Sequence, residues 1–206
     1  MRATICTVAR RLSAFGMRFA RHSDGAAAVE FAVLAPLLLL MLLATIEIGR
    51  AVNSDRHFTA AVGTAGDLVA REKNLGKSKS AALTNLDSMM KSVEHLMQPY
   101  DASTLKLAVI SVFASTKDTT DTRVSWSYSY KGMTAPGECS SYALPNNIVA
   151  AGNTVIVVDA TYVFKPLFGD FVPGFSGAMT WTNKSYHSPR NLCVDYVEGD
   201  NCTKSC

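Results

Sequence analysis

A long apolar stretch near the N-terminus most constrains what this chain of 206 residues can become. It runs from Gly25 to Arg50, and no side chain between Phe31 and Ile46 is ionisable. A helix crosses a bilayer with about 20 apolar residues, because its backbone polar groups pair with one another inside the hydrocarbon. The stretch therefore predicts a membrane-spanning helix over residues 26–49.

The residues before this stretch are basic. They carry no acid before Asp24, and their five arginines are Arg2, Arg10, Arg11, Arg18 and Arg21. Because such residues are enriched on the cytoplasmic side of membrane segments, they predict a cytoplasmic N-terminus and a periplasmic domain over 50–206. A cleaved secretory signal is the main competing interpretation, but its apolar core is usually only about 7 to 15 residues long.

Two acids flank the apolar run, and each needs a way to avoid an unpaired charge in hydrocarbon. We expect Glu47, at the far end, to reach the lipid headgroups; the position of Glu30 alone leaves open whether it does the same. If the chain were cut after Gly25, the new amine of Ala26 would lie one helical turn before Glu30. Neighbouring subunits packed as parallel helices could then pair the two charges.

Pro36 lies inside the same predicted helix. A proline removes one backbone hydrogen bond and tends to loosen the preceding turn, which membrane helices tolerate. Two interpretations stay open: a harmless proline in lipid, or a bend that assists the packing of subunits.

The string around Glu30 resembles a known processing signal. Gly25 is followed by AAAVEF, so that a glutamate and a phenylalanine stand fifth and sixth after the glycine, behind the arginines. This resembles the cleavage site of type IV pilin-like proteins, and GAAAVEFAVLAPLLLL with the later IEIGR resembles the TadE-like family over about residues 22–72. The resemblance implies cleavage between Gly25 and Ala26 by a prepilin peptidase, with Glu30 and Phe31 fifth and sixth in the mature chain.

The same resemblance implies a role and a set of partners. It suggests a minor pilin-like subunit of the tight-adherence (Tad, or Flp) pilus, needed for pilus assembly and surface adherence, in the bacterial inner membrane after loss of a leader over 1–25. The implied partners are the prepilin peptidase, the major Flp pilin, other Tad minor pilins and the inner-membrane assembly platform. We expect TadE or TadF rather than TadG, because TadG carries a larger extra domain. No residue of this sequence distinguishes TadE from TadF. The alternative is an uncleaved single-pass protein that displays a periplasmic binding or scaffolding domain.

Beyond Arg50 the apolar residues keep a helical spacing as far as about Glu72, which predicts a long stalk helix. Gly63 and Gly66 could break it, because each costs about 1 kcal/mol relative to alanine. A turn is expected over 73–79, followed by a second helix over 80–98. Its apolar side, rich in methionine, is interpreted as core rather than as an adaptable binding surface. The residues on that side are Leu83, Leu86, Met89, Met90, Val93, Leu96 and Met97.

From Leu105 the apolar spacing changes to two, which is typical of strands. Strands are expected over 105–113, 123–130, 154–164 and 178–187. Short connections predict hairpins within the first and last pairs, and we expect an antiparallel meander with helices on one face. The predicted fold is α+β and pilin-like: a long N-terminal helix, and a second helix packed on an antiparallel sheet of about four strands.

The cysteines predict disulfides. Cys139, Cys193, Cys202 and Cys206 fall on the periplasmic side, where disulfides persist, so two bridges are expected. Three connectivities are possible, and a bridge from Cys139 to the C-terminal segment is favoured because it would pin the aperiodic loop 132–152. A zinc site that includes His187 is the alternative, but no C-x2-C spacing is present.

Neither a catalytic nor a cofactor motif stands out. The sequence has no nucleophile elbow, Gly-rich phosphate loop or HExxH pattern, and the histidines are scattered. Three acids near the C-terminus do not match a calcium loop and are read as solvated charges. The net charge is only +3, and five of the arginines lie in the expected leader, so no nucleic-acid partner is indicated. We expect a structural protein without enzymatic activity, metal or cofactor.

Overall fold

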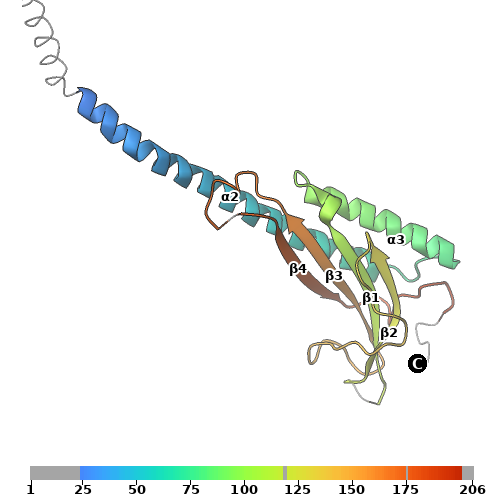
Figure 1. Cartoon of the computed structure of the whole chain (residues 1–206). Coiled ribbons are helices and arrows are strands. Elements are labelled where there is room, and N and C mark those ends of the chain that lie inside the picture. Colours follow the sequence, from blue (N-terminus) through green and yellow to red (C-terminus); the bar gives the residue numbers. More distant parts are fainter. Residues whose placement is uncertain (1–23, 118–119, 175, 201–206) are drawn as a thin grey trace, which may run out of the picture.

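The computed structural model describes residues 24–117, 120–174 and 176–200, and its class is α+β, as predicted (Figure 1). Its helices and strands are α2 (Asp24–Ala70), α3 (Lys79–Glu94), the 3-10 turns η1 (His95–Met97) and η2 (Ala102–Thr104), β1 (Lys106–Ala114), β2 (Thr122–Tyr130), β3 (Thr154–Phe164) and β4 (Met179–His187). The long first helix, the second helix and the four antiparallel strands are those expected from the sequence.

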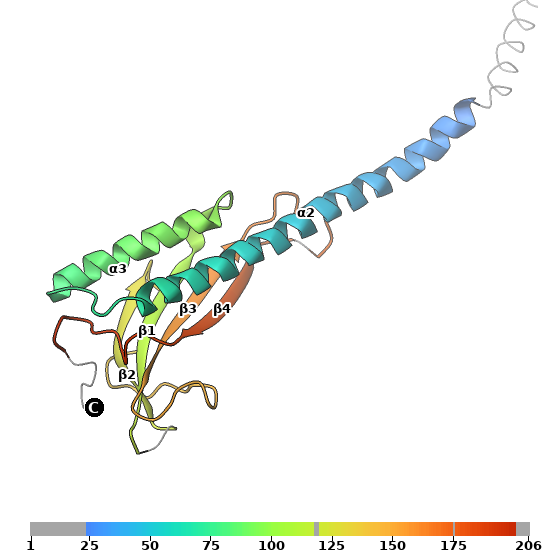
Figure 2. The same ribbon diagram turned by 180° about the vertical axis from the view of Figure 1, so that it is seen from behind.

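Helix α2 is the axis of the molecule. Its N-terminal half projects beyond the domain, and its C-terminal half lies against the sheet, on the same side as α3 (Figures 1 and 2). The half that packs on the sheet buries residues spaced by three or four, which is the stripe of an amphipathic helix. These residues are Phe58, Ala61, Val62, Ala65 and Val69.

The strand order is β2-β1-β3-β4, so the predicted simple meander was wrong. The two expected hairpins are present, but β3 pairs with β1 and not with β2. The reason is burial. Strands β1 and β3 are apolar on both faces and occupy the centre, whereas β2 and β4 alternate with polar residues and form the edges. The connection 131–153 carries the chain from one side of β1 to the other.

The loop within that connection covers the face of the sheet opposite the helices. A second apolar cluster lies there, built on Ile110, Val112, Val124, Val155 and Val157, with Tyr142, Leu144, Val149 and Tyr186 packed against it. The segment around Cys139 also pairs with the edge strand β2, because the Cys139 amide donates to the Val124 carbonyl at 2.8 Å. The hydroxyl of Tyr142 donates to Asp159 and accepts from Lys184, and burial raises its pKa. The loop is therefore held by backbone pairing and by its own core.

Helix α3 lies beside α2 and covers part of the sheet (Figure 2). Ser78 caps its N-terminus by accepting a hydrogen bond from the Ala81 amide. Met90 and Met97 are fully buried, so these methionines belong to the core, as interpreted. Two members of the predicted buried side, Leu83 and Leu96, are instead exposed, because the contact face is centred on Ala82, Leu86, Met90 and Val93.

Gly63 and Gly66 do not break α2, and Gly66 has a packing role. A Cβ atom at Gly66 would lie 2.1 Å from the His187 ring at the end of β4, whereas one at Gly63 would meet nothing within 4 Å. The imidazole Nε2 of His187 is buried without a hydrogen-bond partner, and this burial lowers the pKa of the ring. The missing side chain at Gly66 therefore lets β4 approach the helix closely.

We predict opposite effects of alanine at these two glycines. Gly66→Ala should destabilise the domain by about 1–3 kcal/mol, because the strand end must move away from the helix. Gly63→Ala should stabilise it by up to about 1 kcal/mol through helix propensity. Chemical denaturation of the full chain in detergent micelles, followed by tryptophan fluorescence, measures both. A Gly66→Ala protein as stable as Gly63→Ala would contradict the close approach of His187.

Candidate functional site

The projecting part of α2, from Gly25 to Ile46, is the candidate site. Its large apolar side chains are exposed nearly all round, from Val29 at 65% and Phe31 at 68% to Leu42 at 56% and Ile46 at 41%. A surface of this size on a folded chain marks contact with a membrane or a protein partner. Among the described residues, α2 is the one helix long and apolar enough to cross a membrane.

The predicted processing residues all lie on this projecting segment. Gly25, Ala26, Glu30 and Phe31 are exposed, and a Cβ atom at Gly25 would meet nothing within 4 Å. Packing within the described chain therefore gives no reason for a glycine at position 25. Any requirement for glycine there must come from a partner that binds this segment. The expected leader, apart from Asp24 and Gly25, lies outside the described residues.

Glu30 follows Ala26 by one helical turn, a rise of about 6 Å. No hydrogen bond or ion pair joins its carboxylate to another described residue, and the residue is exposed. The helix continues through Pro36, which is exposed as well. Within the described residues, the folded domain therefore supplies no counter-charge for Glu30.

Glu47 does not face the headgroups as expected. Its side chain is fully buried, and its Oε1 atom accepts hydrogen bonds from the backbone amides of Leu167 and Phe168, both at 2.6 Å. Arg50 Nη1 lies 3.3 Å from the same oxygen. The expectation was wrong because the β3–β4 connection folds over α2 and brings two amide donors to the carboxylate. No local pattern in the sequence reveals partners that lie 120 and 121 positions away.

Aromatic rings extend this contact into the sheet. The guanidinium of Arg50 lies over the Phe164 ring at 5.9 Å, and that ring stacks on Trp181 at 5.1 Å with an angle of 8° between the planes. Arg50 thus contacts both the buried carboxylate and Phe164 at the end of β3, and Phe164 in turn contacts β4 through Trp181. We call the set Glu47, Arg50, Phe164, Leu167 and Phe168 the helix–domain junction.

Of the four predicted disulfide cysteines, the structure describes Cys139 and Cys193, which lie at the opposite end of the domain from Glu47. Cys139 and Cys193 are each disulfide-bonded, and Cys202 and Cys206 lie outside the described residues. The connectivity of the two expected bridges stays a prediction. The segment around Cys193 closes the end of α2, because the Arg190 amide donates to the Ala70 carbonyl and the Asp195 amide donates to the Lys73 carbonyl.

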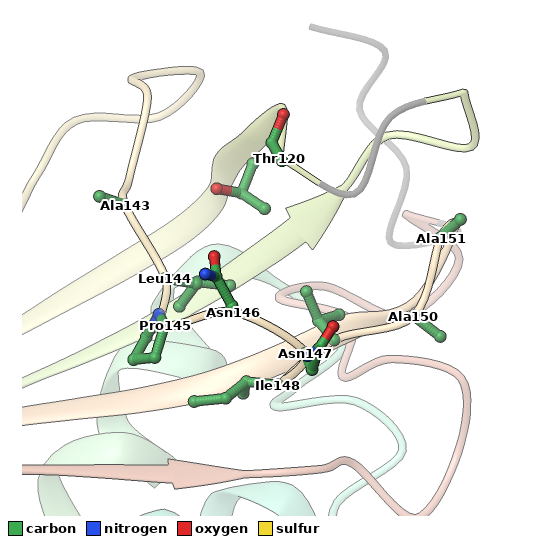
Figure 3. A pocket seen from close by; sticks show the side chains of 11 residues that line it. Thr120, Ala143, Leu144, Pro145, Asn146, Asn147, Ile148, Ala150 and Ala151 are labelled. Atoms are coloured by element: carbon green, nitrogen blue, oxygen red, sulfur yellow. The ribbon is translucent and has the colours of Figure 1, made fainter.

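A hollow of about 720 Å³ lies between the β1–β2 connection and the loop 143–151 (Figure 3). Its described lining carries no ionisable side chain. The lining residues therefore offer no group for acid–base chemistry. Among the described residues, no group of three or more histidines, cysteines or acids gathers in a way that could hold a metal ion.

We predict that Glu47→Ala uncouples the β3–β4 connection from the helix. Two buried amides would lose their acceptor, at a cost of about 1–3 kcal/mol for each unsatisfied group. Hydrogen exchange of the full chain in detergent micelles should show faster exchange at Leu167 and Phe168, with little change in the centre of the sheet. Glu30→Ala, on the same helix but without these contacts, is the matched control. Unchanged exchange at the two amides would contradict this account of Glu47.

Comparison with known proteins gives one match, and it falls on the helix that carries the candidate site. Residues 25–67 match the family model described as TadE-like protein. The match ends near the last turn of α2, and the sheet domain lies beyond it. No significant match to the chain was found among curated proteins or among solved structures.

Proposed function

Because residues 25–67 match the family model described as TadE-like protein, we propose that this chain is a minor pilin-like subunit required for Tad pilus assembly and surface adherence. The family implies a role associated with the Tad pilus. In the proposal, α2 first holds the protein in the inner membrane, with the sheet domain in the periplasm. A prepilin peptidase then cuts between Gly25 and Ala26, and the mature subunit acts with the Flp pilin, other minor pilins and the assembly platform.

The observation that carries the proposal is the coincidence of the family match with α2. The matched segment begins at Gly25, the expected cleavage position, and includes the whole projecting apolar helix. A helix that is hydrophobic all round is suited to a bilayer or to the inside of a helical bundle. A pilin-like subunit needs one helix that lies first in the bilayer and later in the helical bundle of the pilus.

Glu30 could assist the transfer of the helix from the bilayer to the packed helices of the pilus. Cleavage would create a positive amine at Ala26, one turn before the exposed carboxylate of Glu30. Between parallel helices of neighbouring subunits, the two charges could neutralise each other, whereas either one alone would be costly to bury. The exposure of Glu30 leaves its carboxylate available for such a contact.

An uncleaved single-pass membrane protein is the second candidate. The same exposed helix supports it, because an anchor needs only apolar length. Only the cleaved pilin-like subunit requires the GAAAVEF string. The intact mass of the protein from membranes separates the two: loss of residues 1–25 supports the pilin-like subunit, and a full-length chain supports the anchor.

The first functional prediction concerns Gly25. Gly25→Val should leave only uncleaved protein in the membrane, because a peptidase that recognises glycine beside the scissile bond would exclude a branched side chain. Gly49→Val is the matched control, since Gly49 lies on the same helix and a Cβ atom there also meets nothing within 4 Å. Immunoblots of membrane fractions report the cleaved and uncleaved bands. A normal mature band from Gly25→Val would refute recognition at this glycine.

The second concerns Glu30. Glu30→Gln should give a protein that folds and enters the membrane normally, because the side chain makes no contact with the domain. Pilus formation and surface attachment should be lost, since the amine of Ala26 would be buried between subunits without its counter-charge, at a cost of several kcal/mol. Electron microscopy and an attachment assay measure the outcome. If Glu30→Gln cells made normal pili, the pairing between subunits would be refuted and Glu30 would be a residue of the headgroup region.

A further inference from the structure

We propose that the β3–β4 connection over residues 165–174 is a second membrane-contacting element, which docks on the lipid surface where α2 leaves the bilayer. The proposal rests on the membrane-spanning role of α2 given above. It adds an interaction surface on the sheet domain, outside the segment that the family match covers.

The first argument is exposure. Leu167 is 67% exposed and Phe171 is 70% exposed, whereas Phe168 in the same connection is partly buried and Val172 is buried. The connection is a compact turn, because the amides of Phe171 and Val172 both donate to the Phe168 carbonyl. A turn with an internal core that presents a leucine and a phenylalanine outward has the character of an interfacial anchor.

The second argument is position. From Ala26 to Ile46, α2 rises about 30 Å, which matches the hydrocarbon thickness of a bilayer. The next residue is Glu47, and its carboxylate holds the amides of Leu167 and Phe168 at 2.6 Å. Since the connection is fixed at this residue, it lies at the level where the helix passes from hydrocarbon to headgroups. It lies beside the projecting half of α2 in both views (Figures 1 and 2).

The third argument is the distribution of charge at this end of the domain. Lys165 and Asp170 are exposed beside the apolar tips, as expected for a segment that stays at the interface. Arg50 and Lys165 line a hollow of about 130 Å³, together with Tyr100 and Asp101. Arg50 is already paired with Glu47, so Lys165 is the base that this hollow offers to a lipid headgroup, and Tyr100 is of a residue type common at the interface. Lipid is the occupant that we propose, because Glu47 fixes the connection, with its exposed Leu167 and Phe171, at the end of the predicted span.

Site-specific photocrosslinking in the full chain tests the proposal. A p-benzoylphenylalanine residue replaces Phe171 or Leu167, both exposed, and the protein is reconstituted into vesicles of phosphatidylethanolamine and phosphatidylglycerol. Leu38, within the predicted span, is the positive control. Leu192, which is 79% exposed at the other end of β3, is the negative control. After irradiation, mass spectrometry quantifies phospholipid adducts at each position.

We expect several-fold more phospholipid adduct at positions 171 and 167 than at 192. Adduct at 38 with only the background of 192 at positions 171 and 167 would overturn the docking of the connection and leave the spanning helix intact. Adducts between two copies in place of lipid would also overturn it and assign this surface to subunit contact. Absence of lipid adduct at 38 would overturn the span itself, and with it both proposals.

Discussion

The buried carboxylate of Glu47 connects the two parts of this molecule. A carboxylate at the end of an apolar helix is costly unless donors surround it, and two backbone amides without acceptors are costly in a buried turn. Each group supplies what the other lacks, since the amides of Leu167 and Phe168 both donate to Glu47. Charge-assisted hydrogen bonds of this kind contribute about 1.5–3 kcal/mol each. The projecting helix and the sheet domain are thereby held together at the residue where the apolar stretch ends.

Helix α2 has different patterns of apolar residues before and after Glu47. Before Glu47 most of its large apolar side chains are exposed, and from Phe58 onward a stripe of apolar side chains is buried against the domain. The first pattern suits hydrocarbon or a bundle of similar helices, and the second suits a helix lying on a sheet in water. One continuous helix can meet both demands because its hydrogen bonds are internal, so that a change of surroundings does not require a change of backbone.

Local periodicity was enough to predict the helices and the four strands. Local periodicity failed where the structure depends on contacts between segments that lie far apart in the sequence. The central position of β1 follows from its apolar character on both faces, but its pairing with β3 depends on the path of a long connection that has no period of its own. Glu47 looked like a headgroup residue because its partners are backbone amides, which any sequence provides. The string around Gly25 and Glu30 can be recognised because it is local, and cleavage there stays a prediction.

Two contacts fix how the domain sits on its helix. Glu47 binds the β3–β4 connection, and the gap at Gly66 receives His187 at the end of β4. These positions lie about 28 Å apart along the helix, and β4 runs between them. The buried stripe of α2 between these positions also packs on the sheet. The domain and this part of α2 therefore form one packed unit, so the domain turns only when the helix turns. In any assembly built by packing the projecting helices, the direction of each sheet domain is consequently set by the rotation of α2.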